Sequence, residues 1–339
     1  MNATEITEAL RRTPDSDAPP WLGAAALRRL LPAGVVVDAV AAALRHAGPR
    51  AVSGHAALAY DVDAGAFHVK TTALDAPRAV YIAKINANFP GNPARGLPTI
   101  QGVAALFDAE DGRLLALLDS PELTALRTGA ATAVAARHLA RADSTRCLVV
   151  GAGRQALAQV TALAGVLPLA RVAVFDLEAT RARQLAQRLE TELGLAVELP
   201  SEIGTAALAS DVVVTCTTAR APILFRRQVA PGTFIAAVGA DHPSKQEIEP
   251  ALVAEARTFV DSLEQALACG ELRHAVAAGV IAPEAVAGRL DELVTGAALG
   301  RLSADEITLF DSTGIALEDA AAALAAFERW LDESRSPTP

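Results

Sequence analysis

The stretch that decides the fold is Cys147-Leu148-Val149-Val150-Gly151-Ala152-Gly153-Arg154-Gln155-Ala156, in which an apolar run ends in two closely spaced glycines. The apolar run predicts a buried strand, and the spacing of apolar residues over 154–166 predicts a helix that begins directly after the turn. Gly151 permits a tight turn, Gly153 lets the backbone approach a ligand, and Ala156 is small enough for close helix–strand packing. Because the N-terminal amides of that helix face the turn, the stretch predicts a site for a pyrophosphate group.

A carboxylate follows at the end of the next predicted strand, residues 171–175. Asp176 lies 25 positions after Gly151, where a carboxylate can accept hydrogen bonds from the ribose hydroxyls and repels a 2′-phosphate. The sequence therefore favours NAD(H) as the cofactor. Arg181 and Arg183 keep NADP(H) as an alternative, and a structural turn that binds no nucleotide is another.

Short apolar runs alternate with amphipathic stretches from residue 146 to residue 260. Such alternation is typical of an α/β fold with a doubly wound parallel sheet that helices cover on both faces. Ligands of this fold lie at the carboxyl ends of its strands, so Thr217, which follows the strand predicted over 211–215, is a candidate cofactor contact. Ordinary capping of the strand end is the alternative for this hydroxyl. Before residue 120 the pattern differs, and five runs predict an antiparallel sheet: 55–61, 66–72, 79–86, 100–108 and 114–118.

The composition excludes several classes of protein. The 339 residues include 30 Lys and Arg against 39 Asp and Glu, and the net charge of −9 argues against nucleic-acid binding, which needs clustered positive charge. Three distant cysteines, Cys147, Cys216 and Cys269, predict neither a disulfide framework nor a metal site. Because the chain shows no apolar run long enough for a membrane span and no signal-peptide pattern, we expect a cytoplasmic protein.

Six runs, taken in order, carry a resemblance to a known family. They are Lys84-Ile85-Asn86, Phe89 to Thr99, Leu123 to Ala131, Gly151 to Gln155, Val238 to Glu247 and Thr308 to Gly314. In these runs the sequence resembles the ornithine cyclodeaminase/mu-crystallin family of nicotinamide-dependent enzymes. The resemblance implies a homodimer. It also implies a Rossmann domain, residues 123–305, inserted into an α+β substrate-binding and dimerisation domain that both chain ends form, residues 1–122 and 306–339.

Two charged residues are the candidates for catalysis. Lys84 lies on a predicted strand between apolar neighbours, where its ammonium can hold a substrate carboxylate or polarise an imine, and the resemblance assigns it to substrate binding. Asp241 follows the strand predicted over 233–238, and the resemblance makes it the proton donor and acceptor at the substrate nitrogen. We expect burial to raise the pKa of Asp241 into a useful range. The alternatives are a solvated surface lysine for Lys84 and an Asx cap for Asp241.

The resemblance also implies further contacts with the cofactor and the substrate. Arg127 matches an arginine that reaches the pyrophosphate, with a salt bridge on the helix surface as the alternative. Lys245 matches a cofactor-contacting position, with a solvated turn residue as the alternative. The other matched positions are, for the cofactor, Thr99, Arg154, Gln155, Val238, Gly239 and Ser312 and, for the substrate, Thr313.

The sequence departs from the family in the run Phe67-His68-Val69-Lys70-Thr71. This run lacks two residues that the family carries, an arginine for the substrate carboxylate and an acidic residue. Lys70 is the candidate replacement for the arginine, and His68 stands near the place of the acid. Because Lys70 and His68 alternate along a strand, both point to one face. A histidine with no role in the site is the equal alternative for His68. The missing acid would be needed to recognise a side-chain ammonium such as that of ornithine. Elsewhere, Glu271, Arg273 and His274 form a polar cluster in the helix predicted over 269–276. We expect a solvated helix face there, with lining of the site as the alternative.

These residues predict an NAD(H)-dependent oxidoreductase that acts at the α-carbon of an amino or imino acid, as an imine or ketimine reductase or an amino-acid dehydrogenase. Cyclodeamination of ornithine or lysine, with NAD recycled in the turnover and ammonia released, is the first alternative. A non-catalytic protein that binds a nicotinamide nucleotide is the second. The expected partners are a small amino or imino acid and a second copy of the chain, with no nucleic acid and no membrane.

Overall fold

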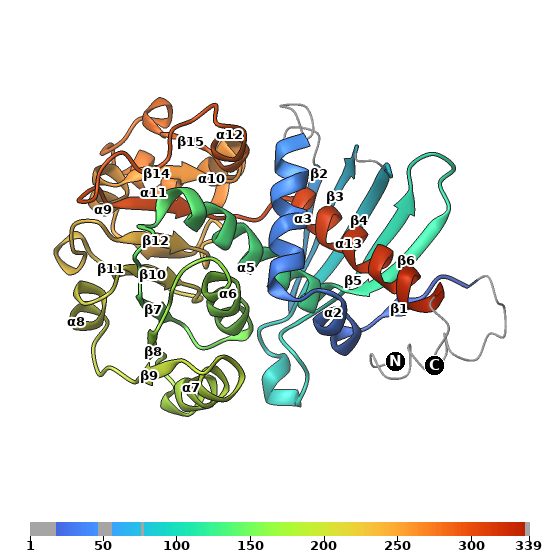
Figure 1. Ribbon diagram of the computed structural model, residues 1–339, viewed down its shortest axis with the longest axis horizontal. Helices are drawn as coiled ribbons and strands as arrows, with labels where there is room; N and C mark the ends of the chain where they lie inside the picture. Colours follow the sequence, from blue (N-terminus) through green and yellow to red (C-terminus); the bar gives the residue numbers. More distant parts are fainter. Residues whose placement is uncertain (1–17, 47–55, 76–77, 336–339) are drawn as a thin grey trace. The chain divides into compact units, whose positions relative to one another are not determined.

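The computed structural model describes residues 18–46, 56–75 and 78–335 (Figure 1). Contacts between residues divide the chain into two compact units, each with one large β-sheet. Unit 1 comprises Met1–Ala39, His46–Thr124 and Ala316–Pro339. Unit 2 comprises Val40–Arg45 and Ala125–Ile315.

Unit 2 is built on an eight-stranded sheet in which all neighbouring strands are parallel. Across the sheet the strands are β15 (Gly288–Arg289), β14 (Arg257–Val260), β16 (Thr308–Asp311), β12 (Phe234–Ala237), β10 (Val212–Thr215), β7 (Arg146–Val150), β8 (Arg171–Phe175) and β9 (Ala196–Glu198). The chain starts at β7, builds outward through β8 and β9, and then returns to β10 on the other side of β7. This confirms the predicted doubly wound sheet, which binds its ligands in the crevice where the strand order reverses, here between β7 and β10.

Helices connect the strands of this sheet. They are α5 (Ser120–Leu139), which enters the unit from unit 1, α6 (Arg154–Ala164), α7 (Ala179–Leu193), α8 (Ile203–Leu208), α9 (Pro250–Glu255), α10 (Leu263–Cys269), α11 (Glu271–Ala277) and α12 (Leu290–Thr295). Two short strands, β11 (Arg220–Leu224) and β13 (Gln246–Ile248), form a separate parallel pair. The sequence pattern did not predict this pair.

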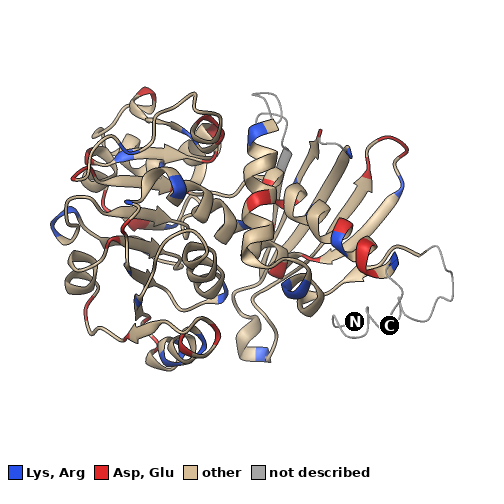
Figure 2. Cartoon of the chain, in the orientation of Figure 1, with Lys and Arg blue, Asp and Glu red and all other residues tan. Residues whose placement is uncertain are grey.

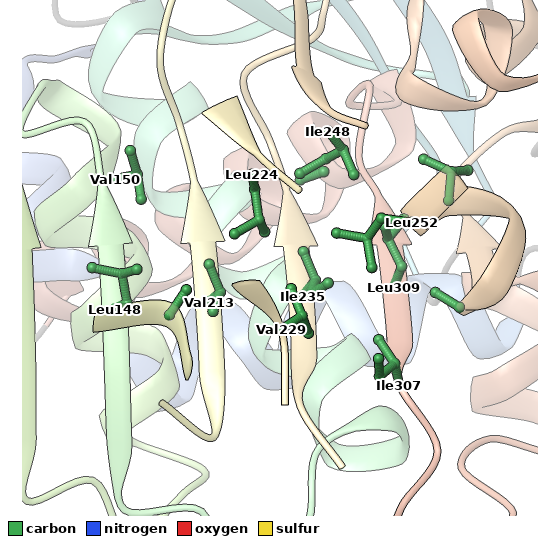
Figure 3. Close-up of a cluster of buried hydrophobic side chains, with 14 of the residues drawn as sticks. Leu148, Val150, Val213, Leu224, Val229, Ile235, Ile248, Leu252, Ile307 and Leu309 are labelled. Carbon is green, nitrogen blue, oxygen red and sulfur yellow. The ribbon is translucent and has the colours of Figure 1, made fainter. Parts of the chain in front are cut away.

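The centre of the eight-stranded sheet is buried because its strands are continuous apolar runs. On one face, Leu148 of β7, Val213 of β10, Ile235 of β12 and Leu309 of β16 follow one another across the sheet and are 0% exposed (Figure 3). Burying each such side chain contributes roughly 1.5–3 kcal/mol. The packed centre therefore holds the carboxyl ends of these strands in fixed relative positions.

Unit 1 is built on a six-stranded sheet with the order β1-β6-β5-β4-β3-β2. Its five long strands form the predicted antiparallel sheet, while β1 adds to β6 in parallel. The helix α13 (Ala316–Arg335) packs against β3, β4, β5 and β6, so the two chain ends share one core. The other elements are β1 (Trp21–Leu22), α2 (Ala24–Leu30), β2 (Ala56–Val62), β3 (Gly65–Leu74), β4 (Val80–Asn88), β5 (Ile100–Asp108) and β6 (Leu114–Asp119). The helix α3 (Ala33–His46) is divided, since its residues Val40–Arg45 belong to unit 2.

Strand β16 corrects one predicted boundary. We expected residues 306–339 to belong to the domain that the chain ends form, but β16 pairs in parallel with both β12 and β14 of unit 2. All four of its residues are buried, and a strand buried on both faces requires a partner on each edge. The chain enters unit 1 only at Ala316.

Charged residues are spread over both units (Figure 2). In this view Lys and Arg alternate with Asp and Glu along the ribbons and form no continuous basic stripe. Within the described ranges, no helix combines the length and the apolar character that a bilayer crossing needs.

Candidate functional site

The glycine turn after β7 has the geometry that its sequence predicts. Gly151 has a φ of +99°, a conformation that favours glycine, and a Cβ at this position would lie 2.8 Å from the carbonyl oxygen of Cys216. Gly153 precedes α6 in an extended conformation, and no side chain caps this helix. A Cβ on Gly153 would meet nothing within 4 Å, so open space lies beside the first amides of α6. This space fits a pyrophosphate group.

Asp176 lies against the same turn. Its Oδ2 accepts a hydrogen bond from Ala152 N at 2.7 Å, and its Oδ1 accepts one from Glu178 N at 2.8 Å. The carboxylate is therefore held beside the glycine turn, where the adenosine ribose of a dinucleotide lies in this fold. Arg181, which would favour a 2′-phosphate, is paired with Glu178 at 2.9 Å.

Two predicted cofactor residues carry buried polar atoms that have no hydrogen-bond partner among the described residues, Oε1 of Gln155 and Oγ of Ser312. Gln155 lies in the first turn of α6, and Ser312 follows β16, where its amide donates to Ala237 O at 2.9 Å. Buried polar groups usually have a partner, so these two atoms fit a site that a polar ligand completes. The residues present at this edge of unit 2 thus fit a dinucleotide.

Arg127 is a buried residue of α5, with 5% of its surface exposed, so the alternative of a surface salt bridge is wrong. Its guanidinium covers Gly314, where a Cβ would lie 2.4 Å from Nη1. Thr313 is also buried, and its hydroxyl donates to Oδ1 of Asp261 at 2.7 Å. This bond ties Thr313 to Asp261 in the loop after β16, and its role as a substrate contact stays a prediction.

Asp241 differs from the expectation of a buried acid. It lies in the loop beyond β12, its side chain is 57% exposed, and Oδ1 accepts a hydrogen bond from Lys245 Nζ at 2.5 Å. Strand β12 ends at Ala237, so Asp241 lies four positions beyond the sheet. This position explains both its exposure and its pairing with Lys245.

The residues directly before Asp241 are buried. Val238 is 8% exposed and its amide donates to Thr215 O at 2.8 Å, which extends the pairing with β10 one residue beyond the end of β12. Gly239 N donates to Glu247, as does Thr217 N, so two predicted cofactor residues share one buried carboxylate. The Thr217 hydroxyl accepts a bond from Ala219 N at 3.0 Å, which matches the capping alternative.

Four acids form a buried acid cluster: Glu247, Asp261, Glu271 and Asp311, each at most 1% exposed. The sequence analysis gave no role to Glu247, Asp261 or Asp311. Glu271 was expected on a solvated helix face, and this expectation is wrong because α11 packs against α9 and β13. Burial raises the pKa of Glu247, and burial raises that of Glu271 well above its ordinary value. Burial likewise raises the pKa of Asp311 to about 7, although the amides of Leu272 and Glu271 lower it. In the sequence these four acids look like acids on the surface. Only the burial of the segments that carry them distinguishes the two kinds.

Asp311→Asn is expected to change how stability depends on pH. The native pKa of about 7 exceeds the ordinary 3.8, so this group favours the folded state at low pH and loses that contribution as the pH rises toward 7. Asparagine does not titrate and keeps an oxygen that accepts the bond from Leu272 N. Between pH 5 and pH 8 the variant should gain on the order of 2–3 kcal/mol relative to the wild type.

Denaturant unfolding at several pH values measures this effect. The matched control is Asp305→Asn, an exposed aspartate of the same unit, whose curve should run parallel to the wild type. Parallel curves for Asp311→Asn and the wild type would show that Asp311 does not titrate in this range.

In unit 1 the register of β3 and β4 brings the predicted substrate residues together. Lys70 lies directly opposite Lys84, and His68 lies opposite Asn86 two positions along, so all four share one face of the sheet. Lys84 is 3% exposed, which excludes the solvated surface lysine. Its Nζ pairs with Oδ2 of Asp319 on α13 at 2.6 Å and donates to Oγ1 of Thr124 at 3.2 Å.

Asp319 is a further residue to which the sequence analysis gave no role. It is 0% exposed, and the pairing with Lys84 joins residues 235 positions apart in the chain.

Thr99 lies directly before β5 and is partly exposed, and its carbonyl accepts a hydrogen bond from Phe89 N at 2.8 Å. Arg154 is exposed in the first turn of α6. Most of the predicted residues therefore form two groups, one at the strand ends of unit 2 and one on the β3–β4 face of unit 1, and Thr99 belongs to neither.

A doubly wound parallel sheet with a glycine turn after its first strand and a carboxylate after its second defines a dinucleotide-binding protein of the Rossmann class. The model of the ornithine cyclodeaminase/mu-crystallin family matches residues 32–334, and the chain belongs to this family. This confirms the family to which the sequence motifs point.

Three similar proteins show the range of this family. The Delta(1)-pyrroline-2-carboxylate reductase of Paracoccus denitrificans is 42% identical over 239 residues, which cover 69% of this chain and 74% of that protein. An archaeal alanine dehydrogenase, solved as a dimer with bound NAD, is 33% identical with a TM-score of 0.86 over 93% of this chain and 97% of the other. A lysine cyclodeaminase structure is 32% identical with a TM-score of 0.81 and covers 93% of each chain.

Proposed function

We propose that this protein is an NAD(H)-dependent oxidoreductase that acts at the α-carbon of an amino or imino acid. The observation that carries the proposal is the glycine turn at the switch point of unit 2 with the Asp176 carboxylate bonded to it. The relatives named as a pyrroline-2-carboxylate reductase and an alanine dehydrogenase support it. Both reactions transfer a hydride to or from an α-carbon that bears nitrogen.

The residues of unit 2 hold the dinucleotide. The amides at the start of α6 donate hydrogen bonds to the pyrophosphate, and Asp176 accepts hydrogen bonds from the hydroxyls of the adenosine ribose. Gln155 and Ser312 bring the buried polar atoms that a polar ligand would satisfy. When bound, NAD(H) supplies or accepts the hydride.

The remaining roles are ionic and acid–base. Lys84 and Lys70 provide ammonium groups for the substrate carboxylate, and the buried Asp319 holds Lys84 in place by pairing with its Nζ. Asp241 holds or releases a proton at the substrate nitrogen, and its exposure gives that proton a path to water.

Assays of NADH absorbance and of ammonia separate the proposed reaction from its alternatives. Net NADH consumption with pyruvate and ammonia, pyrroline-2-carboxylate or piperideine-2-carboxylate supports a reductase or dehydrogenase. Ammonia release from ornithine or lysine without a net change in NADH indicates a cyclodeaminase, the activity of one similar structure. Nucleotide binding without either reaction indicates a non-catalytic protein and contradicts the proposal.

Asp176→Ala is expected to lower the preference for NADH over NADPH by about 10-fold, because the variant loses a ribose acceptor and the charge that repels a 2′-phosphate. The measurement is the ratio of kcat/KM with the two cofactors. Glu192→Ala is the matched control, since this acid pairs with Arg188 on the exposed face of α7. An unchanged ratio in Asp176→Ala would remove the ribose role.

We also propose that the chain is a cytoplasmic homodimer that associates through one face of the unit 1 sheet. Leu58, Tyr60, Phe67, Tyr81 and Ile85 lie on the face opposite to Lys84 and are 40–68% exposed. Large contiguous apolar patches are rare on monomers and mark interaction sites. The similar alanine dehydrogenase, solved as a dimer, supports a dimeric state.

Leu58→Asp is expected to convert the dimer into a monomer, because the symmetry of a dimer interface places the new charge in it twice. Light scattering after gel filtration measures the mass. Leu177→Asp, at a leucine of unit 2 that is 95% exposed, should leave the mass unchanged. A Leu58→Asp variant with the mass of the wild type would exclude this face.

A further inference from the structure

One buried carboxylate joins the ends of two neighbouring strands in unit 2. Oε1 of Glu247 accepts a hydrogen bond from Thr217 N at 2.6 Å, and Oε2 accepts one from Gly239 N and one from Thr215 Oγ1, both at 2.8 Å. Thr215 is the last residue of β10, Thr217 follows that strand, and Gly239 follows β12. Glu247 itself comes from β13, so it reaches both loops from outside the large sheet.

These loops border the switch-point crevice and are closely packed. A Cβ on Gly239 would lie 2.5 Å from Oε2 of Glu247 and 2.5 Å from Thr217 O. On the other side, a Cβ on Gly151 would lie 3.0 Å from Cγ2 of Thr217. The glycine turn, the end of β10 and the end of β12 are therefore in contact, and Glu247 ties the second to the third.

A second acid fixes Glu247 in turn. Oε1 of Glu271 accepts a bond from Glu247 N at 2.7 Å, and Oε2 accepts one from Ile248 N at 3.1 Å. Burying a carboxylate is costly unless hydrogen bonds compensate for the lost water. The three donors that converge on Glu247 provide that compensation. This arrangement points to a specific role for the carboxylate at this place.

We propose that Glu247 is a positioning residue for the cofactor. By accepting hydrogen bonds from the amides of Thr217 and Gly239, it fixes the positions of the two loops against which the nicotinamide half of the cofactor binds. The inference rests on the proposed function, because it concerns the same crevice. Glu247 acts without touching the cofactor. Its effect is preorganisation, since loops already held in the binding conformation lose less entropy when the ligand binds.

Glu247→Gln tests the proposal. The amide keeps the shape of the side chain but has one acceptor oxygen, so at least one of the three buried donors loses its partner. We expect KM and Kd for NADH to rise about 10-fold, which is typical of one unsatisfied buried donor. We expect kcat at saturating NADH to change little, because the reacting residues are intact.

Amide exchange without nucleotide provides a second measurement. Exchange at Thr217 and Gly239 should become at least about 10-fold faster in Glu247→Gln, by the same loss of a partner. The Val238 amide, which donates to Thr215 O, is the internal reference. Glu249→Gln is the matched control, because the Glu249 carboxylate accepts a hydrogen bond from Arg226 N and from neither strand end.

The outcomes separate the inference from the proposed function. Glu247→Gln with the NADH affinity of the wild type, or with unchanged exchange at both amides, overturns the inference alone. A wild-type protein that binds no nicotinamide nucleotide overturns both. If Glu247→Gln does not fold, Thr215→Val removes one donor at constant shape and should raise the Kd for NADH about threefold. An unchanged Kd in Thr215→Val then overturns the inference.

Discussion

Asp241→Asn is expected to lower kcat at least ~100-fold, the effect typical of removing a general acid–base group. The amide has the size of the carboxylate, and the backbone bond from Asp241 N to Gly239 O can remain. It can neither take up nor release a proton at the substrate nitrogen. The Kd for NADH should stay close to that of the wild type, because the glycine turn and Asp176 are unchanged.

Steady-state kinetics and NADH fluorescence titration measure the two quantities separately. His242→Gln is the matched control in the same exposed loop, where Nδ1 contacts Ser244 Oγ, and its kcat should stay within about twofold of the wild type. Asp241→Asn with wild-type turnover would remove Asp241 from the mechanism. A large rise in its Kd for NADH would assign it to binding instead.

Lys84→Met is expected to lower kcat/KM by about 1,000-fold and the free energy of unfolding by about 3–5 kcal/mol. The first effect follows from losing the ammonium for the substrate carboxylate. The second follows because Asp319, which is 0% exposed, keeps a buried charge without its partner. Activity assays and denaturant unfolding measure the two effects on one preparation.

The double variant Lys84→Met/Asp319→Leu separates these two roles. Replacing both members of a buried ion pair by apolar residues is often neutral for stability, so the double variant should regain most of the lost free energy. Its activity should stay low, because no cation is restored. Recovery of activity together with stability would mean that Lys84 serves the fold alone.

Local patterns were sufficient wherever one segment carries the whole signal. The apolar run, the glycines and the helix of residues 147–156 lie next to one another in the chain, and the structure places them as β7, the turn and α6. The alternation of His68 and Lys70 gave their common face, and the register of β3 with β4 adds Lys84 to it. Periodicity also separated the antiparallel sheet of unit 1 from the parallel sheet of unit 2.

Local patterns failed where a residue's environment comes from distant parts of the chain. Thr308–Asp311 has the pattern of any buried strand, and only its pairing with β12 and β14 assigns it to unit 2. Asp241 was expected to be buried because it follows an apolar strand, but the chain leaves the sheet before reaching it.

The amino-acid sequence alone determined the class of sheet, the nucleotide turn and the family, because backbone periodicity and glycine geometry are properties of neighbouring residues. Only the tertiary structure decided that Asp319 pairs with Lys84 and that Glu247 ties β10 to β12. An acidic side chain looks the same in sequence whether it is solvated or buried. Its burial, its partners and therefore its role depend on segments that folding brings together.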